Sequence, residues 1–110
     1  GAKAPAKRRE DIDLLLQGVK QIVGILDGSK QEQRNYAKNF LDSKIPEILL
    51  RAGIQAPTPK QLIDGTLRLF QIARKDKFHS KNCTSLKYVY NKAGAIVMST
   101  NSNKPKVGIV

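Results

Sequence analysis

The chain has 110 residues, 40% of them hydrophobic and 26% charged, and twenty Lys and Arg residues against nine Asp and Glu give a net charge of +11. A chain of this length forms one domain with a single core, which argues against an enzyme with a cleft between domains. The positive excess favours a polyanionic partner, whether nucleic acid, an anionic membrane or an acidic protein.

The first residues of the chain, GAKAPAKRRE, are small and basic and include a proline. Residues 1–10 are therefore predicted to be a disordered basic arm that precedes one domain over residues 11–110. Lys7, Arg8 and Arg9 are candidate phosphate-binding residues or a nuclear-import signal. The alternative is that they only keep the terminus solvated.

An amphipathic helix is predicted from Asp11 onward, because apolar residues recur at spacings of three and four. Asp27 and Gly28 are expected to end it, with glycine in a left-handed conformation. Leu14 and Ile25 lie off the apolar stripe, so we expect this helix to contact protein on more than one side. The stripe consists of Ile12, Leu15, Leu16, Val19, Ile22, Val23 and Leu26.

A second helix is predicted to begin at Ser29, which forms the pattern of a capping box with Glu32. Pro46 removes one helical hydrogen bond, so we expect a kink or a new helix there. Gly53 is expected to end this region.

A third helix is predicted after Thr58, which forms a second capping box with Gln61, and Pro59 suits the first helical position. Arg74 and Lys75 follow at its C-terminal end, where the helix dipole favours cations. Its buried face is expected to contain Leu62, Ile63, Leu67, Phe70 and Ala73.

The apolar spacing changes to two after this helix, at Leu86, Tyr88 and Tyr90. The sequence NKAG at 91–94 fits a type I turn closed by glycine, which predicts a β-hairpin over about residues 86–100. The second strand, AIVM, is apolar on both faces, so it needs either the terminal VGIV as a third strand or a second chain. The predicted fold class is α+β and mainly α, with three to four helices followed by this C-terminal hairpin, either winged-helix-like or as a hairpin-paired dimer.

More than half of the excess charge lies between residues 60 and 92, which hold eight basic and two acidic residues. If the helix end and the hairpin tip are neighbours in space, these cations form one surface for a phosphate backbone. The candidate nucleic-acid-binding residues of this segment are Arg68, Arg74, Lys75, Lys77, Lys81, Lys87 and Lys92.

Two arrangements on nucleic acid remain open. In one, residues 46–53 and 59–75 form a helix-turn-helix and the hairpin is a wing. In the other, which we favour, the hairpins of two chains pair, and His79, Tyr88 and Tyr90 either stack on bases or pack in the core.

The sequence thus predicts a non-catalytic nucleic-acid-binding domain, a homodimer that holds DNA or RNA mainly through phosphates. The alternative is an adaptor module that docks another protein, including an acidic one, through an exposed apolar helix or hairpin surface.

No catalytic residue, metal ligand or cofactor is predicted. His79 and Cys83 are the only His and Cys of the chain, and a structural zinc site needs about four ligands. A single cysteine cannot form an internal disulfide, so we expect an intracellular protein, cytoplasmic or nuclear. No membrane span is expected, because no apolar run approaches the length that crosses a bilayer. Association with a membrane surface is disfavoured, because no predicted helix combines a basic face with a bulky aromatic apolar face.

Overall fold

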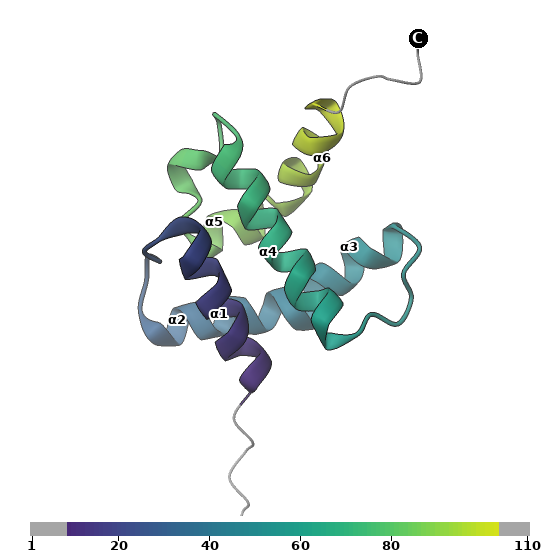
Figure 1. Cartoon of the computed structure of the whole chain (residues 1–110), viewed down its shortest axis with the longest axis horizontal. Helices are drawn as coiled ribbons and strands as arrows, with labels where there is room; N and C mark the ends of the chain where they lie inside the picture. The colour runs from purple at the N-terminus through teal and green to yellow at the C-terminus, as the bar shows by residue number, and fades with distance from the viewer. Residues whose placement is uncertain (1–8, 104–110) are drawn as a thin grey trace, which may run out of the picture.

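The computed structural model describes residues 9–103, and within this range every regular element is a helix (Figure 1). None of these helices is both long enough and apolar enough to cross a membrane. In chain order the elements are α1 (Glu10–Val23), α2 (Lys30–Asn39), the π-helical turn η1 (Phe40–Lys44), α3 (Ile45–Arg51), α4 (Pro59–Lys75), the 3-10 turn η2 (Ser80–Asn82), α5 (Leu86–Asn91) and α6 (Ala93–Asn103).

Helix α1 is shorter than its apolar stripe indicates. It ends at Val23, where Gly24 adopts a left-handed φ of +92°, so the prediction that it continues to Gly28 is wrong. Leu26 still reaches the core from the connection to α2, whereas Ile25 is exposed. The spacing of apolar residues therefore identified core residues correctly but placed the helix end too late.

The segments α2, η1 and α3 form one long arm with an irregular centre. Ser29 caps α2 as predicted, its hydroxyl accepting a hydrogen bond from the Glu32 amide at 3.1 Å. At the other end of η1 the Ile45 amide donates to the Phe40 carbonyl, and Pro46 lies in the first turn of α3. A new helix thus begins beside Pro46, where the missing proline amide is tolerated.

Helix α4 is the centre of the fold. It contacts α1, η1, α3, η2, α5 and α6, and Figure 1 shows α1 and α4 side by side across the α2–α3 arm. Its capping box is confirmed, since the Gln61 amide donates to Thr58 Oγ1 (3.2 Å) and the Thr58 amide donates to Gln61 Oε1 (2.8 Å). A Cβ on Gly18 of α1 would lie 2.8 Å from Leu67 Cδ2. Glycine at this position therefore permits the close approach of the two helices.

The predicted C-terminal hairpin is wrong, because residues 86–103 are helical apart from Lys92. Leu86, Val89, Ala93 and Ile96 recur at spacings of three, four and three, and all four are buried, as the inner face of a helix requires. Ser85 caps α5 by accepting a hydrogen bond from the Tyr88 amide at 3.0 Å.

Three further predictions are wrong because they depend on the hairpin: the α+β class, the winged-helix-like arrangement and the hairpin-paired dimer. Glycines with positive φ in the described range are Gly24, Gly28 and Gly53, so Gly94 does not close a turn. The apolar run at 95–98 had required a second chain, but Ile96 is covered by helices of the same chain. The terminal VGIV, proposed as a third strand, lies outside the described residues.

Candidate nucleic-acid interface

One side of α4 is exposed along the whole helix and is polar. Its members recur at spacings of four, four, three and four, which places them within about 80° of one another around the helix axis. We call them the α4 stripe: Lys60, Asp64, Arg68, Gln71 and Lys75. Lys60 and Asp64 pair with each other at 3.2 Å, which leaves Arg68 and Lys75 as cations able to meet an outside anion.

The α4 stripe leads into a basic segment at the C-terminal end of the helix. We call its four exposed cations the basic end: Arg74, Lys75, Lys77 and Lys81. The helix dipole favours the first two, which lie in the last turn, but Lys77 and Lys81 come after the helix. Among residues 9–103, no carboxylate forms an ion pair with any of the four. Four unpaired charges within eight residues are a favourable contact for phosphates.

The backbone between α4 and η2 is fixed by Asp76. Its Oδ1 accepts hydrogen bonds from the amides of Phe78 (2.7 Å) and His79 (3.1 Å), and its carbonyl accepts one from the Ser80 amide (2.8 Å). His79 is 5% exposed, and a hydrogen bond of 2.8 Å joins its Nδ1 to Tyr88 Oη of α5. The loop that carries Lys77 and Lys81 is therefore held against the core.

Lys87 and Lys92 lie apart from the basic end. Lys87 lines a pocket of about 70 Å³ that it shares with two carboxylates, Asp27 and Glu32. Helix α5 packs against α2, α4 and α6, and Lys87 lines this pocket together with residues of α2 and of the connection before it. Lys92 lies at the far end of α5, about 9 Å further along its axis than Leu86. Five of the seven cations predicted between residues 60 and 92 thus lie on α4 and the loop after it.

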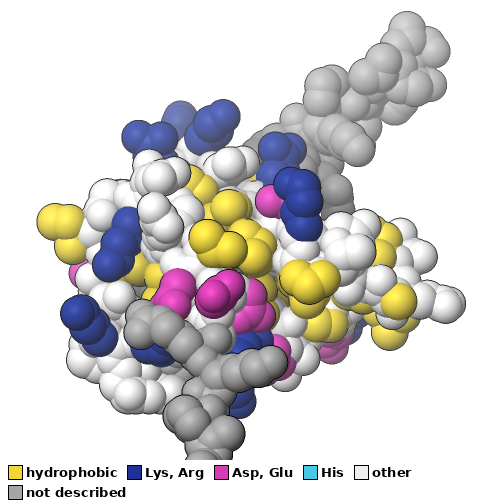
Figure 2. Space-filling model, turned by 60° about the horizontal axis from the view of Figure 1, so that its bottom comes forward, with side chains coloured by type: hydrophobic (Ala, Val, Ile, Leu, Met, Phe, Trp, Pro, Cys, Tyr) yellow, Lys and Arg dark blue, Asp and Glu magenta, His cyan; other side chains and the backbone are white. Residues whose placement is uncertain are grey.

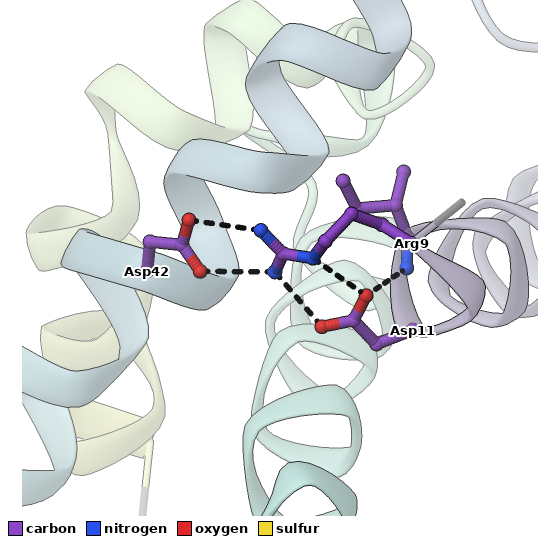
Figure 3. Close-up of polar contacts among 4 residues, drawn as sticks. Arg9, Asp11 and Asp42 are labelled. Atoms are coloured by element: carbon purple, nitrogen blue, oxygen red, sulfur yellow. Dashed lines mark hydrogen bonds and ion pairs between the residues drawn. The ribbon is translucent and has the colours of Figure 1, made fainter. Parts of the chain in front are cut away.

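Arg9 is held by two carboxylates (Figure 3). Its Nε and Nη2 donate to Asp11 at 3.0 and 2.9 Å, and its Nη1 and Nη2 donate to Asp42 of η1 at 3.2 and 3.0 Å. These hydrogen bonds, first to Asp11 and then to Asp42, raise the pKa of the Arg9 guanidinium above its ordinary value. The same guanidinium lowers the pKa of the Asp11 carboxyl. Arg9 therefore links the start of α1 to η1 and has its charge balanced.

The predicted basic arm is only partly within the described residues. Lys7 and Arg8 lie outside them, whereas Arg9 is anchored and Glu10 belongs to α1. Figure 2 shows several acidic side chains gathered in one group near the middle of the face in view. On the same face the Lys and Arg side chains form several separate groups, with hydrophobic and neutral side chains between them.

The aromatic residues proposed for base stacking belong to the core instead. Tyr88 is half-buried and bonded to His79, and the Tyr90 ring meets Phe40 edge to face at a centroid distance of 5.1 Å. Lys44 lies over the Tyr90 ring at 4.7 Å. None of these rings presents a free face of the kind that stacking needs.

A helix-turn-helix does not describe α3 and α4. The connection from Ala52 to Thr58 has seven residues, whereas the turn of that motif has about three to four. Since α4 packs against six other elements, it is a central helix of the core and not a recognition helix.

A groove of about 210 Å³ lies between α3, α4 and α6. Its apolar walls are Ile45, Ile48 and Leu49 of α3, Leu69 and Ile72 of α4, and Val97 of α6. Arg68, the one charged residue among those that line it, connects the groove to the α4 stripe. Leu50 and Met98, neighbours of wall residues, are exposed.

The sequence analysis did not single out Phe78, which lies in the chain between two cations of the basic end, Lys77 and Lys81. Its side chain is 74% exposed, directly beside Lys77. The sequence feature that could have identified Phe78 is its position in a polar segment, where it fits no helical or strand spacing of apolar residues. Known proteins provide no further guidance, since no protein-family model, curated protein or solved structure matches this chain.

Proposed function

We propose that this protein is a non-catalytic nucleic-acid-binding domain that holds phosphates with the basic end of α4. The observation that carries the proposal is the set of four exposed cations between residues 74 and 81, none of which pairs with a described carboxylate. Arg68 extends the contact along the α4 stripe.

Electrostatics support phosphate as the ligand. Like charges held close together repel one another, and the helix dipole offsets this cost for Arg74 and Lys75 only. A phosphate backbone neutralises all four cations and releases its own condensed counterions, which makes binding strongly dependent on salt. The loop is held by Asp76 and His79 before any ligand arrives, so little ordering is needed on binding.

Fluorescence anisotropy of a labelled oligonucleotide at increasing salt tests this function. Affinity for the wild-type chain should fall steeply as salt rises from about 50 to 200 mM. The double variant Lys77→Gln with Lys81→Gln should bind more weakly and reduce the slope of log K against log salt by about two.

The matched control is Lys87→Gln with Lys92→Gln, which removes the same charge from α5. It should leave the slope close to that of the wild type. An absence of oligonucleotide binding at low salt contradicts the function. An equal reduction by both double variants contradicts the location, because binding would then follow net charge alone.

A second candidate function, docking of another protein, is favoured by the groove between α3, α4 and α6. Its apolar walls and Arg68 suit an amphipathic helix with an acidic residue at its edge. A synthetic peptide of that pattern should shift the methyl NMR signals of Ile48 and Val97. Such shifts without any oligonucleotide binding would favour docking over the first proposal.

A further inference from the structure

Phe78 is an exposed aromatic residue in the middle of the basic end. Its ring is 74% exposed, whereas Phe40 and Phe70 are completely buried. Leaving a ring of this size in water forgoes the stabilisation that its burial would give. Lys77 precedes it in the chain and Lys81 follows three residues later, so the ring belongs to a segment rich in positive charge.

The backbone that carries the ring is held in place, and the ring contacts one aromatic neighbour. The Phe78 amide donates to Asp76 Oδ1 at 2.7 Å, which fixes the backbone. Its ring meets the His79 ring edge to face, with centroids 5.1 Å apart and an interplanar angle of 79°. Because His79 is itself buried and bonded to Tyr88, it supports Phe78 from the core side. The backbone and the supporting ring are thus in position before a ligand arrives, which lowers the ordering cost of binding.

We propose that Phe78 is a stacking platform for an unpaired base, so that the basic end prefers single-stranded nucleic acid to a duplex. This inference rests on the proposed function. Proteins that bind single strands combine cations along the backbone with aromatic rings that stack on bases. In a duplex the bases already stack on one another, and Phe78 could reach one only if the helix opened.

The chain contains no tryptophan, which gives a direct test. Phe78→Trp introduces the only tryptophan at the platform, and its emission, excited at a wavelength that the tyrosines do not absorb, should be quenched when a single-stranded oligonucleotide binds. Phe78→Ala should weaken binding of that strand by roughly fivefold to a hundredfold. The salt slope should stay unchanged, because no phosphate contact is lost.

The controls are the same sequence annealed as a duplex and the variant Leu50→Ala, which truncates an exposed apolar residue of α3. Duplex affinity should not change with Phe78→Ala, and Leu50→Ala should bind both forms like the wild type. Thermal melting checks that each variant folds.

Three results would overturn the inference: equal wild-type affinity for strand and duplex, unchanged strand affinity in Phe78→Ala, or unquenched emission in Phe78→Trp. If the Lys77 and Lys81 double variant still lowers the salt slope in that case, the proposed function survives without the platform. If no oligonucleotide binds to the wild type, both fail together.

Discussion

The N-terminal corner around Arg9 and the basic end of α4 both contain positive charge, but they treat it differently. At the corner, Asp11 and Asp42 accept four hydrogen bonds from one guanidinium. At the basic end, no described carboxylate pairs with Arg74, Lys75, Lys77 or Lys81. A cation that lies beside carboxylates contributes its charge to the stability of the fold. A cation without such neighbours keeps its charge for an outside anion, wherever either cation lies in the sequence.

The corner is expected to affect stability and the basic end is expected to affect binding. Arg9, Asp11 and Asp42 keep 37%, 31% and 42% of their side chains exposed, so solvent screens their attraction and the gain stays small. Within the described residues, the helix dipole favours the two members of the basic end in the last turn of α4, Arg74 and Lys75. Variants at the core, the loop support and the corner separate effects on stability from effects on binding.

The largest effect is expected from the packing of α6 on α4 and α5. Ile96→Ala removes a fully buried side chain from α6, and it should lower the free energy of unfolding by about 2–5 kcal/mol. Met98→Ala, two residues further on an exposed position, should change it by less than about 0.5 kcal/mol. Urea denaturation measures both. Equal effects would show that α6 does not pack on the core.

The second-largest effect on the free energy of unfolding is expected from the hydrogen bond between Tyr88 and His79, which supports the loop of the basic end. Tyr88→Phe removes the hydroxyl that bonds to buried His79, and leaving that ring nitrogen without a partner should cost about 1–3 kcal/mol. The salt slope of oligonucleotide binding should be retained, because all four cations remain. A variant as stable as the wild type would mean that water replaces the hydroxyl.

The corner itself should contribute less. Arg9→Gln should lower the free energy of unfolding by up to about 1 kcal/mol, since the pairs that it breaks are partly exposed. Arg51→Gln, whose exposed pair with Glu47 spans 3.6 Å, is the control and should change it less. Neither should alter the salt slope of binding. A slope reduced in Arg9→Gln would place Arg9 among the phosphate contacts.

The smallest effect is the pH dependence of the Asp11 contribution. Since Arg9 lowers the folded-state pKa of Asp11, this carboxylate stabilises the fold above its unfolded pKa of about 3.9 and loses that effect as pH falls through the lowered value. The stability difference between the wild type and Asp11→Asn should therefore shrink from about pH 5 downward. Urea midpoints at several pH values measure it, and a constant difference would contradict the pairing.

The helical part of the fold was predictable where local chemistry fixes it. The Thr58 and Gln61 capping box and the new helix at Pro46 depend on neighbours within one turn. Residues 86–97 fit two periods equally well, since Leu86, Tyr88 and Tyr90 alternate while Leu86 and Val89 also have helical spacing. The choice is made by distant partners, such as His79 for Tyr88 and Phe40 for Tyr90, which no local window contains.

The candidate site also has features that the sequence alone predicts and features that depend on distant packing. The cations of residues 74–81 are neighbours because they are adjacent in the chain, so sequence alone could group them. The separation of Lys87 depends on how α5 packs on α2 and α4. The pairing of Arg9 with Asp42 spans 33 residues, and no spacing rule indicates it.

Cys83 lies directly after η2, where the chain turns from the basic end toward α5. It is buried, and burial raises the pKa of its thiol, so the reactive thiolate is both scarce and shielded in the native state. Because the chain has no other cysteine, the rate of its alkylation by a thiol reagent reports how often this junction opens. A ligand that covers the junction should slow the rate of alkylation. This rate therefore measures occupancy without any label on the ligand.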